Sequence, residues 1–293
     1  MKRNNLKKII NLFSFFALSF TVSAYNWPQQ IVDSDSIASY FGQKIGSEMC
    51  KSIVFLDPAE VSASEDGDLL VFLRETTDNV ESFPSALGNT IILTHEDGLL
   101  SVYGNLDEES VDETIGEKKN FFTGDLIGLT GNSGWQNKRS NLEFQIIDTK
   151  NNTAVNPKLF MPRTENEIRL SINDICLINK NGDYFYLNLH NTLNSGIYKV
   201  YMKRNLIASP YKTSISINGV TVDQISYDTI SEENGKLFVN GKKKYTYTDI
   251  YPNNDLSLLG EVTLTPGKTS LGLYLQDFNG HETRDFYNLS ILN

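Results

Sequence analysis

The chain has 293 residues, of which 36 are acidic and 26 are basic, and its formal net charge is −10. This acidic excess argues against a nucleic-acid partner and against direct adhesion to anionic lipid, because both depend on clustered Lys and Arg. The length is sufficient for two domains of ordinary size.

The N-terminus has the features of a secretory signal. Four Lys and Arg residues precede an apolar run from Ile9 to Val22, which at about 14 residues is shorter than the roughly 20 that span a bilayer. Val22-Ser23-Ala24 fits the small-residue cleavage rule. We therefore expect residues 1–24 to be removed and the mature protein to be periplasmic or secreted, with no membrane span. The alternative is an uncleaved anchor or a core helix.

Short apolar runs broken by turn residues follow from Ser52 onward and predict an antiparallel β domain. The runs are Ile53–Phe55, Leu69–Leu73, Thr90–Thr94, Leu99–Tyr103, Leu126–Leu129 and Leu142–Ile147. Two turns, at Glu65-Asp66-Gly67 and Glu96-Asp97-Gly98, supply residues that tolerate positive φ in tight hairpins. The acidic stretch 105–119 is expected to be an exposed loop.

A polar segment after Pro162 separates this half from a second β-patterned half. There the alternating runs are Tyr184–Leu189, Tyr198–Met202, Thr213–Ile217, Val262–Leu264, Leu271–Leu275 and Phe286–Ile291, with Asn-Gly pairs as hairpin signals between them. We predict an all-β protein, with one domain at residues 25–162, a linker at 163–169 and an immunoglobulin-like β-sandwich at 170–293. Cys50 and Cys176 fall in different domains and are expected to be free thiols.

Several ordered motifs in the first domain carry a family resemblance. They are Ala59–Ala63 with Asp66-Gly67, the hairpin Gly88–Leu106, the Gly-rich segment Thr123–Gly134 and the closing Asn156-Pro157. In this order they resemble the lysostaphin or LytM-type zinc endopeptidases, which cleave peptidoglycan. The resemblance covers roughly residues 26–162 and implies an antiparallel β domain with a substrate groove.

The positions that hold zinc in that family depart from its pattern. A catalytic zinc needs about three N, O or S ligands and one open position for water. The family supplies these ligands from His-x-x-x-Asp and from the second His of His-x-His, where this chain has Cys50, Val54 and Glu143. Asn141 replaces the first His of that pair, which handles protons, and Asn105 replaces the His of Tyr-x-His-Leu. We therefore expect neither a bound zinc nor a catalytic residue.

Two further residues are candidates for lining the groove, namely His95 and Tyr103. His95 matches the His-x-x-Gly position of the family, where a hydrogen-bonding histidine at a strand end is favoured over a ligand. A different metal site from Cys50, Glu143 and His95 has too few ligands for catalytic zinc. Acidic residues, at 96–97 and 107–109, are expected beside the positions that lack the family's zinc ligands, where a basic partner could bind them.

The resemblance implies an exported, catalytically inactive endopeptidase-like protein that binds the cell wall or regulates wall hydrolases, as degenerate family members activate cell-wall amidases. Its expected partner is peptidoglycan or an envelope protein such as a wall hydrolase. Two alternatives remain open. One is an active peptidoglycan metalloendopeptidase with an atypical metal site, and the other is a structural or adhesive envelope protein whose C-terminal domain makes the contacts.

Overall fold

The structure, a computed structural model, describes residues 25–30, 33–56, 58–74, 85–115, 118–135, 140–164 and 168–293. The expected signal segment, residues 1–24, lies outside them. The regular structure of the described residues is almost entirely β-strand, which confirms the all-β prediction. None of the helices in these ranges has the length and apolar character needed to cross a bilayer.

Within the described residues, the first half of the chain has short strands, two 3₁₀ turns and one helix. The helical elements are η1 (Ser34–Ser36), α1 (Glu108–Ile115) and η2 (Pro157–Leu159). The strands are β1 (Ile37–Ser39), β2 (Lys44–Ile45), β3 (Glu48–Met49), β4 (Ile53–Phe55), β5 (Glu60–Ser62), β6 (Gly67–Leu73), β7 (Thr90–Thr94), β8 (Leu99–Gly104), β9 (Asn120–Phe121), β10 (Leu126–Leu129), β11 (Glu143–Asp148) and β12 (Thr153–Val155).

The second half contains longer strands and one short helix, α2 (Tyr247–Ile250). The strands are β13 (Cys176–Asn179), β14 (Tyr184–Tyr186), β15 (Thr192–Asn194), β16 (Gly196–Lys203), β17 (Lys212–Ile217), β18 (Val220–Glu233), β19 (Lys236–Asn240), β20 (Lys244–Thr246), β21 (Leu256–Leu264), β22 (Gly267–Gln276) and β23 (Glu282–Leu292). The hairpin turn Asn218-Gly219 has φ values of 52° and 83°, as an Asn-Gly turn between twisted strands requires.

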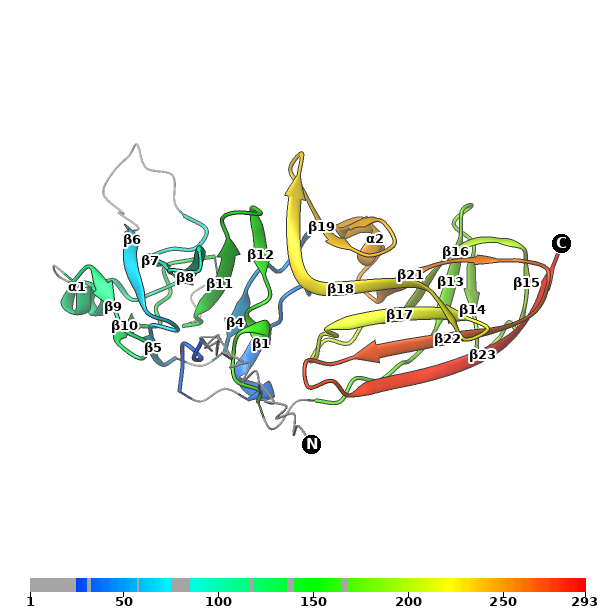
Figure 1. The fold of residues 1–293 in the computed structure, drawn as a ribbon, viewed down its shortest axis with the longest axis horizontal. Helices are drawn as coiled ribbons and strands as arrows, with labels where there is room; N and C mark the ends of the chain where they lie inside the picture. Colours follow the sequence, from blue (N-terminus) through cyan, green and yellow to red (C-terminus); the bar gives the residue numbers. More distant parts are fainter. Residues whose placement is uncertain are drawn as a thin grey trace, which may run out of the picture.

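One large sheet runs through both halves of the chain. Its strand order is β15-β23-β22-β17-β18-β12-β11-β8-β7-β6-β9. The long strand β18 makes the connection, because its first part pairs with β17 and its later part pairs with β12, where Ala154 lies opposite Ile230. Figure 1 shows β18 running beside β17 and then bending upward beside β12. The large sheet therefore continues from the first half of the chain into the second. The domain boundary expected at residues 163–169 stays a prediction.

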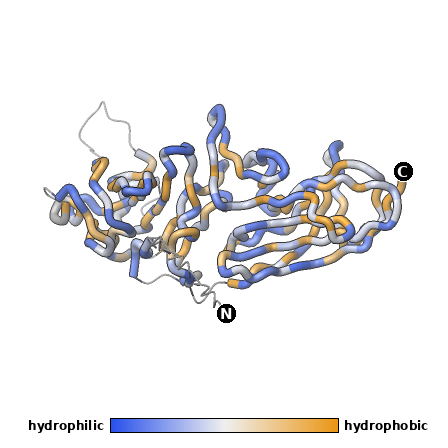
Figure 2. The backbone as a smooth tube through the Cα atoms, in the orientation of Figure 1, coloured by the Kyte–Doolittle hydropathy of each residue, from blue (hydrophilic) through white to orange (hydrophobic). Residues whose placement is uncertain are grey.

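The second half is a two-layer β-sandwich. A four-stranded sheet in the order β14-β13-β16-β21 packs against the part of the large sheet formed by β17, β22 and β23. Apolar side chains from both layers share one core, among them Leu177 and Val200 from one sheet and Leu273 and Ile291 from the other. Figure 2 shows the hydrophobic segments along these strands, with hydrophilic turns projecting from them. Its immunoglobulin-like character stays a prediction.

The stretch expected to be an exposed loop, residues 105–119, instead contains α1. The carboxylate of Asp107 accepts a hydrogen bond from the backbone N–H of Ser110 at 3.0 Å, as N-cap residues do. Val111 and Ile115, one turn apart, are both buried in the core of the first half. Gly128 of β10 leaves space for the helix, because a Cβ there would lie 2.8 Å from Val111. The loop prediction was wrong because it weighed the acidic composition of the stretch and not the spacing of Val111 and Ile115, which form one apolar helix face.

Candidate functional site

The five positions that the sequence resemblance matches to the family's site residues lie together, around the start of β11. This strand runs between β8 and β4, so that Glu143 is opposite Gly104 on one side and Val54 on the other. Cys50 precedes β4, Asn105 follows β8 and Asn141 precedes β11, and all five residues are buried. We call this group of five residues the vacated site.

The Glu143 carboxylate is the centre of the vacated site and is held by side-chain donors. One oxygen accepts hydrogen bonds from the Ser52 hydroxyl at 3.1 Å and from the Gln145 amide at 3.0 Å. The other accepts from the indole N–H of Trp135 at 2.5 Å. On the neighbouring strand, the Val54 side chain offers no donor atom. The carboxylate is therefore held by the protein's own hydrogen bonds, at the position that the resemblance matches to a zinc ligand.

The Cys50 thiol is buried and lies within hydrogen-bonding range of Ser52, at 3.1 Å from its carbonyl oxygen and 3.3 Å from its hydroxyl. Burial raises the pKa of this thiol to about 11, and the Glu143 charge adds to the rise, whereas the contacts with Ser52 oppose it. The group is thus a neutral thiol at physiological pH. A thiolate is the attacking form of cysteine, so without a metal or a base beside it this thiol is a weak nucleophile.

The Asn105 side chain has a structural role within the vacated site. Asn105 has a positive φ of 64°, which asparagine tolerates better than most residues. Its amide donates to the carbonyl oxygens of Gly131 and Asn141, and its side-chain oxygen accepts from the backbone N–H of Gly134. These bonds tie the end of β8 to the Gly-rich segment and to the start of β11. An amide has no pKa suited to proton transfer.

The residues present do not fit a catalytic zinc. In the part of the chain that the structure describes, His, Cys, Asp and Glu side chains nowhere gather in a group of three or more that could hold a metal ion. Of the three positions that would supply ligands, one is an apolar Val54, one is a neutral buried Cys50 and one is the hydrogen-bonded Glu143. Zinc needs about three donors, and this arrangement does not provide them.

His95 and Tyr103, expected to line the groove, lie on the opposite face of the sheet. Side chains alternate along β8 and β11, so Tyr103 and its partner Phe144 point away from the face that carries Glu143. Both His95 and Tyr103 are buried; the Tyr103 hydroxyl accepts from the backbone N–H of Ser64, and the His95 ring nitrogens lie 2.8 Å from the Asp66 carbonyl and 2.9 Å from the Ser101 hydroxyl. They support the hairpin and core of this half.

The acidic residues expected beside the vacated site are divided between the two ends of β8. Glu96 and Asp97 lie in the turn before β8, whereas Glu143 pairs with its last residue, Gly104. Five residue steps of a strand separate these ends by roughly 17 Å. Only the acidic group that begins at Asp107 lies at the end of β8 near the vacated site.

Trp135 is the site residue that the sequence did not indicate. It follows the Gly-rich segment, its ring is 41% exposed and its indole N–H reaches Glu143. The one signal in the sequence that could have indicated this residue was the Trp next to Gly134. Amphipathic aromatic side chains often combine an exposed ring with one hydrogen bond. The vacated site therefore has an aromatic surface beside a held carboxylate.

Comparisons with known proteins identify a peptidase-like domain in the first half of the chain. A family model described as Peptidase family M23 matches residues 53–157, and a second family model, which carries no description, matches residues 169–292. An uncharacterized protein of Treponema pallidum (strain Nichols) is 33% identical over 120 residues, covering 38% of this chain and 79% of that protein.

Similarity to solved structures is confined to part of the chain. A zinc-containing peptidase from Vibrio cholerae has a TM-score of 0.35 and 23% identity, with 46% of this chain and 39% of that chain covered. The catalytic domain of the prophage-encoded M23 protein EnpA from Enterococcus faecalis has a TM-score of 0.33 and 19% identity, with 41% and 87% covered. The SpoIIQ-SpoIIIAH pore forming complex has a TM-score of 0.36 and 19% identity, with 50% and 95% covered.

Proposed function

Because this chain belongs to the family of the Treponema pallidum protein and contains a Peptidase family M23 domain at residues 53–157, we propose that it is an exported envelope protein whose domain binds without cleaving. Its ligand is peptidoglycan, or an envelope protein such as a wall hydrolase that it regulates. Export is proposed from the signal-like segment at residues 1–24.

The hydrogen bonding of Glu143 carries this proposal. An active metallopeptidase keeps its ligand atoms directed at the metal and one metal position open for water. Here Ser52, Gln145 and Trp135 donate to the carboxylate, and Val54 stands on the adjacent strand. The site thus uses its one central charge to hold protein donors together.

The test uses the mature protein, residues 25–293, with an active M23 peptidase as control. Both proteins are incubated with excess zinc and dialysed, and their metal content is measured by mass spectrometry while turbidity of purified peptidoglycan sacculi is followed. We expect well under one zinc per chain, no clearing, and co-sedimentation with sacculi or with a wall hydrolase. Stoichiometric zinc together with chelator-sensitive clearing would instead establish an atypical metalloendopeptidase.

A deletion separates binding by the M23 domain from a purely adhesive role of the second half. Variants that lack residues 25–162 or 170–293 are checked for folding by circular dichroism and then assayed for the same co-sedimentation. If the fragment without residues 25–162 folds and binds sacculi as the full chain does, the M23 domain is a scaffold and the proposal fails.

A further inference from the structure

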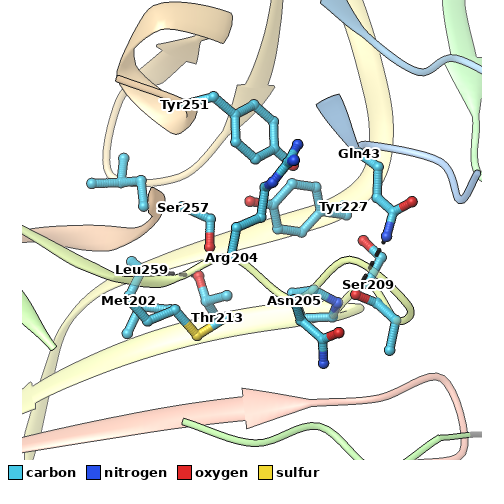
Figure 3. Close-up of a pocket in the computed structure, with 13 residues that line it drawn as sticks. Gln43, Met202, Arg204, Asn205, Ser209, Thr213, Tyr227, Tyr251, Ser257 and Leu259 are labelled. Carbon is cyan, nitrogen blue, oxygen red and sulfur yellow. Dashed lines mark hydrogen bonds between the residues drawn. The ribbon is translucent and has the colours of Figure 1, made fainter. Parts of the chain in front are cut away.

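A second site lies outside the M23 domain, in a small pocket where the second half of the chain meets the N-terminal segment. We call it the Arg204 pocket; its polar lining includes Gln43, Arg204, Asn205, Tyr227, Tyr251 and Ser257. Arg204 directly follows β16, Tyr227 belongs to β18 and Tyr251 follows α2. In Figure 3 the guanidinium end of Arg204 is drawn between the rings of Tyr227 and Tyr251.

Hydrogen bonds from the N-terminal segment close one side of this pocket. The Tyr251 hydroxyl donates to the carbonyl oxygen of Gly42 at 2.7 Å, and the Gln43 amide lies 3.4 Å from the carbonyl oxygen of Ala208. The Arg204 backbone N–H donates to the carbonyl oxygen of Asp255 at 2.6 Å. The backbone around the guanidinium is therefore fixed. The wall of the pocket comes from both halves of the chain.

The Arg204 side chain has no acceptor in the described part of the chain. Its Nε atom is buried without a hydrogen-bond partner, and the ion pairs of the described residues do not include it. Arg204 is also the one charged residue among those that line the pocket. Burial raises the pKa of Tyr251 well above its ordinary value, and the nearby Arg204 charge opposes that rise. Arg204 as a residue is half-buried, and its guanidinium is always charged and carries five donors, of which the Nε–H is buried and unpaired.

Two more residues that carry donor groups, Asn205 and Ser257, line the pocket. The side-chain oxygen of Asn205 accepts from the backbone N–H of Ile207, which leaves the amide N–H groups for a ligand, and Ser257 contributes a hydroxyl. Beyond the pocket, Leu206 and Ile207 are 65% and 60% exposed. The pocket is small, so a ligand can bury only a head group there.

We propose that the Arg204 pocket binds a carboxylate group, carried by a small organic acid or by the C-terminal residue of a peptide. A carboxylate is planar and accepts two parallel hydrogen bonds from a guanidinium. Its single negative charge balances the single charge of the pocket, whereas a phosphate would bring a charge that one Arg does not neutralise. This site goes beyond the proposed function of the M23 domain and does not depend on it.

The test is calorimetric titration of the mature protein in a carboxylate-free buffer. The probes are acetate, propionate, inorganic phosphate, and tri-alanine with either a free or an amidated C-terminus. We expect saturable binding of acetate or of the free-acid peptide, weakened about tenfold or more by Arg204→Gln. Lys203→Gln is the matched control, because Lys203 is the adjacent residue, is exposed and forms only a long ion pair of 3.9 Å with Asp174.

The two sources of carboxylate give different patterns. Binding of acetate and propionate without the peptide assigns a small organic acid, and binding of the free-acid peptide but not its amide assigns a C-terminus. Nuclear Overhauser contacts between ¹³C-acetate and the ring protons of Tyr227 and Tyr251 test the site in the unmodified protein, should Arg204→Gln fail to fold. Absence of saturable binding, equal binding by Arg204→Gln, or tighter binding of phosphate than of acetate overturns the proposal.

Discussion

Replacing Glu143 with alanine shows whether its carboxylate stabilises the fold or is retained as an unused metal ligand. The carboxylate accepts hydrogen bonds from Ser52, Gln145 and Trp135. A ligand kept for a metal would be costly in the metal-free protein, since a buried charge is unfavourable without partners. A carboxylate held by three donors contributes stability instead, and its removal should destabilise the protein.

The three donors differ in how much hydrogen-bonding free energy they lose when the carboxylate is removed. Hydrogen bonds to charged groups contribute about 1.5–3 kcal/mol each, but Trp135 is 41% exposed, so water can replace its partner, and Gln145 is also partly accessible. The Ser52 hydroxyl is buried and is left with the Cys50 sulfur, a weak hydrogen-bond partner at 3.3 Å. Together with the lost packing of the side chain, we expect Glu143→Ala to lower the free energy of unfolding by about 2–4 kcal/mol. Glu143→Gln keeps one oxygen and should cost about half as much.

Urea unfolding followed by tryptophan fluorescence measures this change, because Trp135 is one of two tryptophans and contacts Glu143 directly. Each protein is unfolded with and without a chelator. Glu282→Ala, in an exposed position on β23, is the control and should stay within about 0.5 kcal/mol of the unmodified protein. An unchanged or increased stability of Glu143→Ala, or a loss of stability of the unmodified protein on chelation, would refute the reasoning.

Three further predictions concern the vacated site and the link between the halves. The triple variant Cys50→His/Val54→Asp/Glu143→His should bind about one zinc and gain thermal stability from it. The single variant Val54→Asp should not. Burial raises the pKa of Cys50 in the folded state to about 11, against an ordinary value of 9.0. The neutral thiol therefore contributes stability below pH 9 that is lost as the pH rises toward 11. In urea unfolding, the free energy of unfolding of Cys50→Ala should fall less steeply over this pH range than that of the unmodified protein. Proteolytic fragments cut within 163–169 should co-elute in gel filtration, because β12 pairs with β18.

The strands most accurately predicted are those specified by local pattern. β4, β7 and β10 have the same bounds as the apolar runs Ile53–Phe55, Thr90–Thr94 and Leu126–Leu129, because a short apolar run between turn residues leaves little choice of conformation. β18 was not predicted. Its 14 residues include many polar side chains, and besides its hairpin neighbours β17 and β19 it pairs with β12, which is distant in sequence. Its turn to β19, Asn234-Gly235, was a usable hairpin signal.

The candidate site was predictable as a set of positions but not as a set of contacts. Family motifs located Cys50, Val54 and Glu143, and strand register brings them together. The donors to Glu143 come from separate segments, and no local pattern links Trp135 to a carboxylate eight residues later. The groove assignment of Tyr103 depended on the face of β8, which reverses with a shift of one residue and is fixed only by pairing with β11.

The continuity of the large sheet determines how the two proposed sites relate. Glu143 begins β11, β11 pairs with β12, and β12 pairs with β18, which also carries Tyr227 of the Arg204 pocket. Each step is a ladder of backbone hydrogen bonds between neighbouring strands, so the two sites are held at a fixed separation and do not move as modules on a flexible linker. A partner that engaged both sites would therefore need a matching rigid spacing. Changing the length of the linker at 163–169 alone would leave that spacing intact.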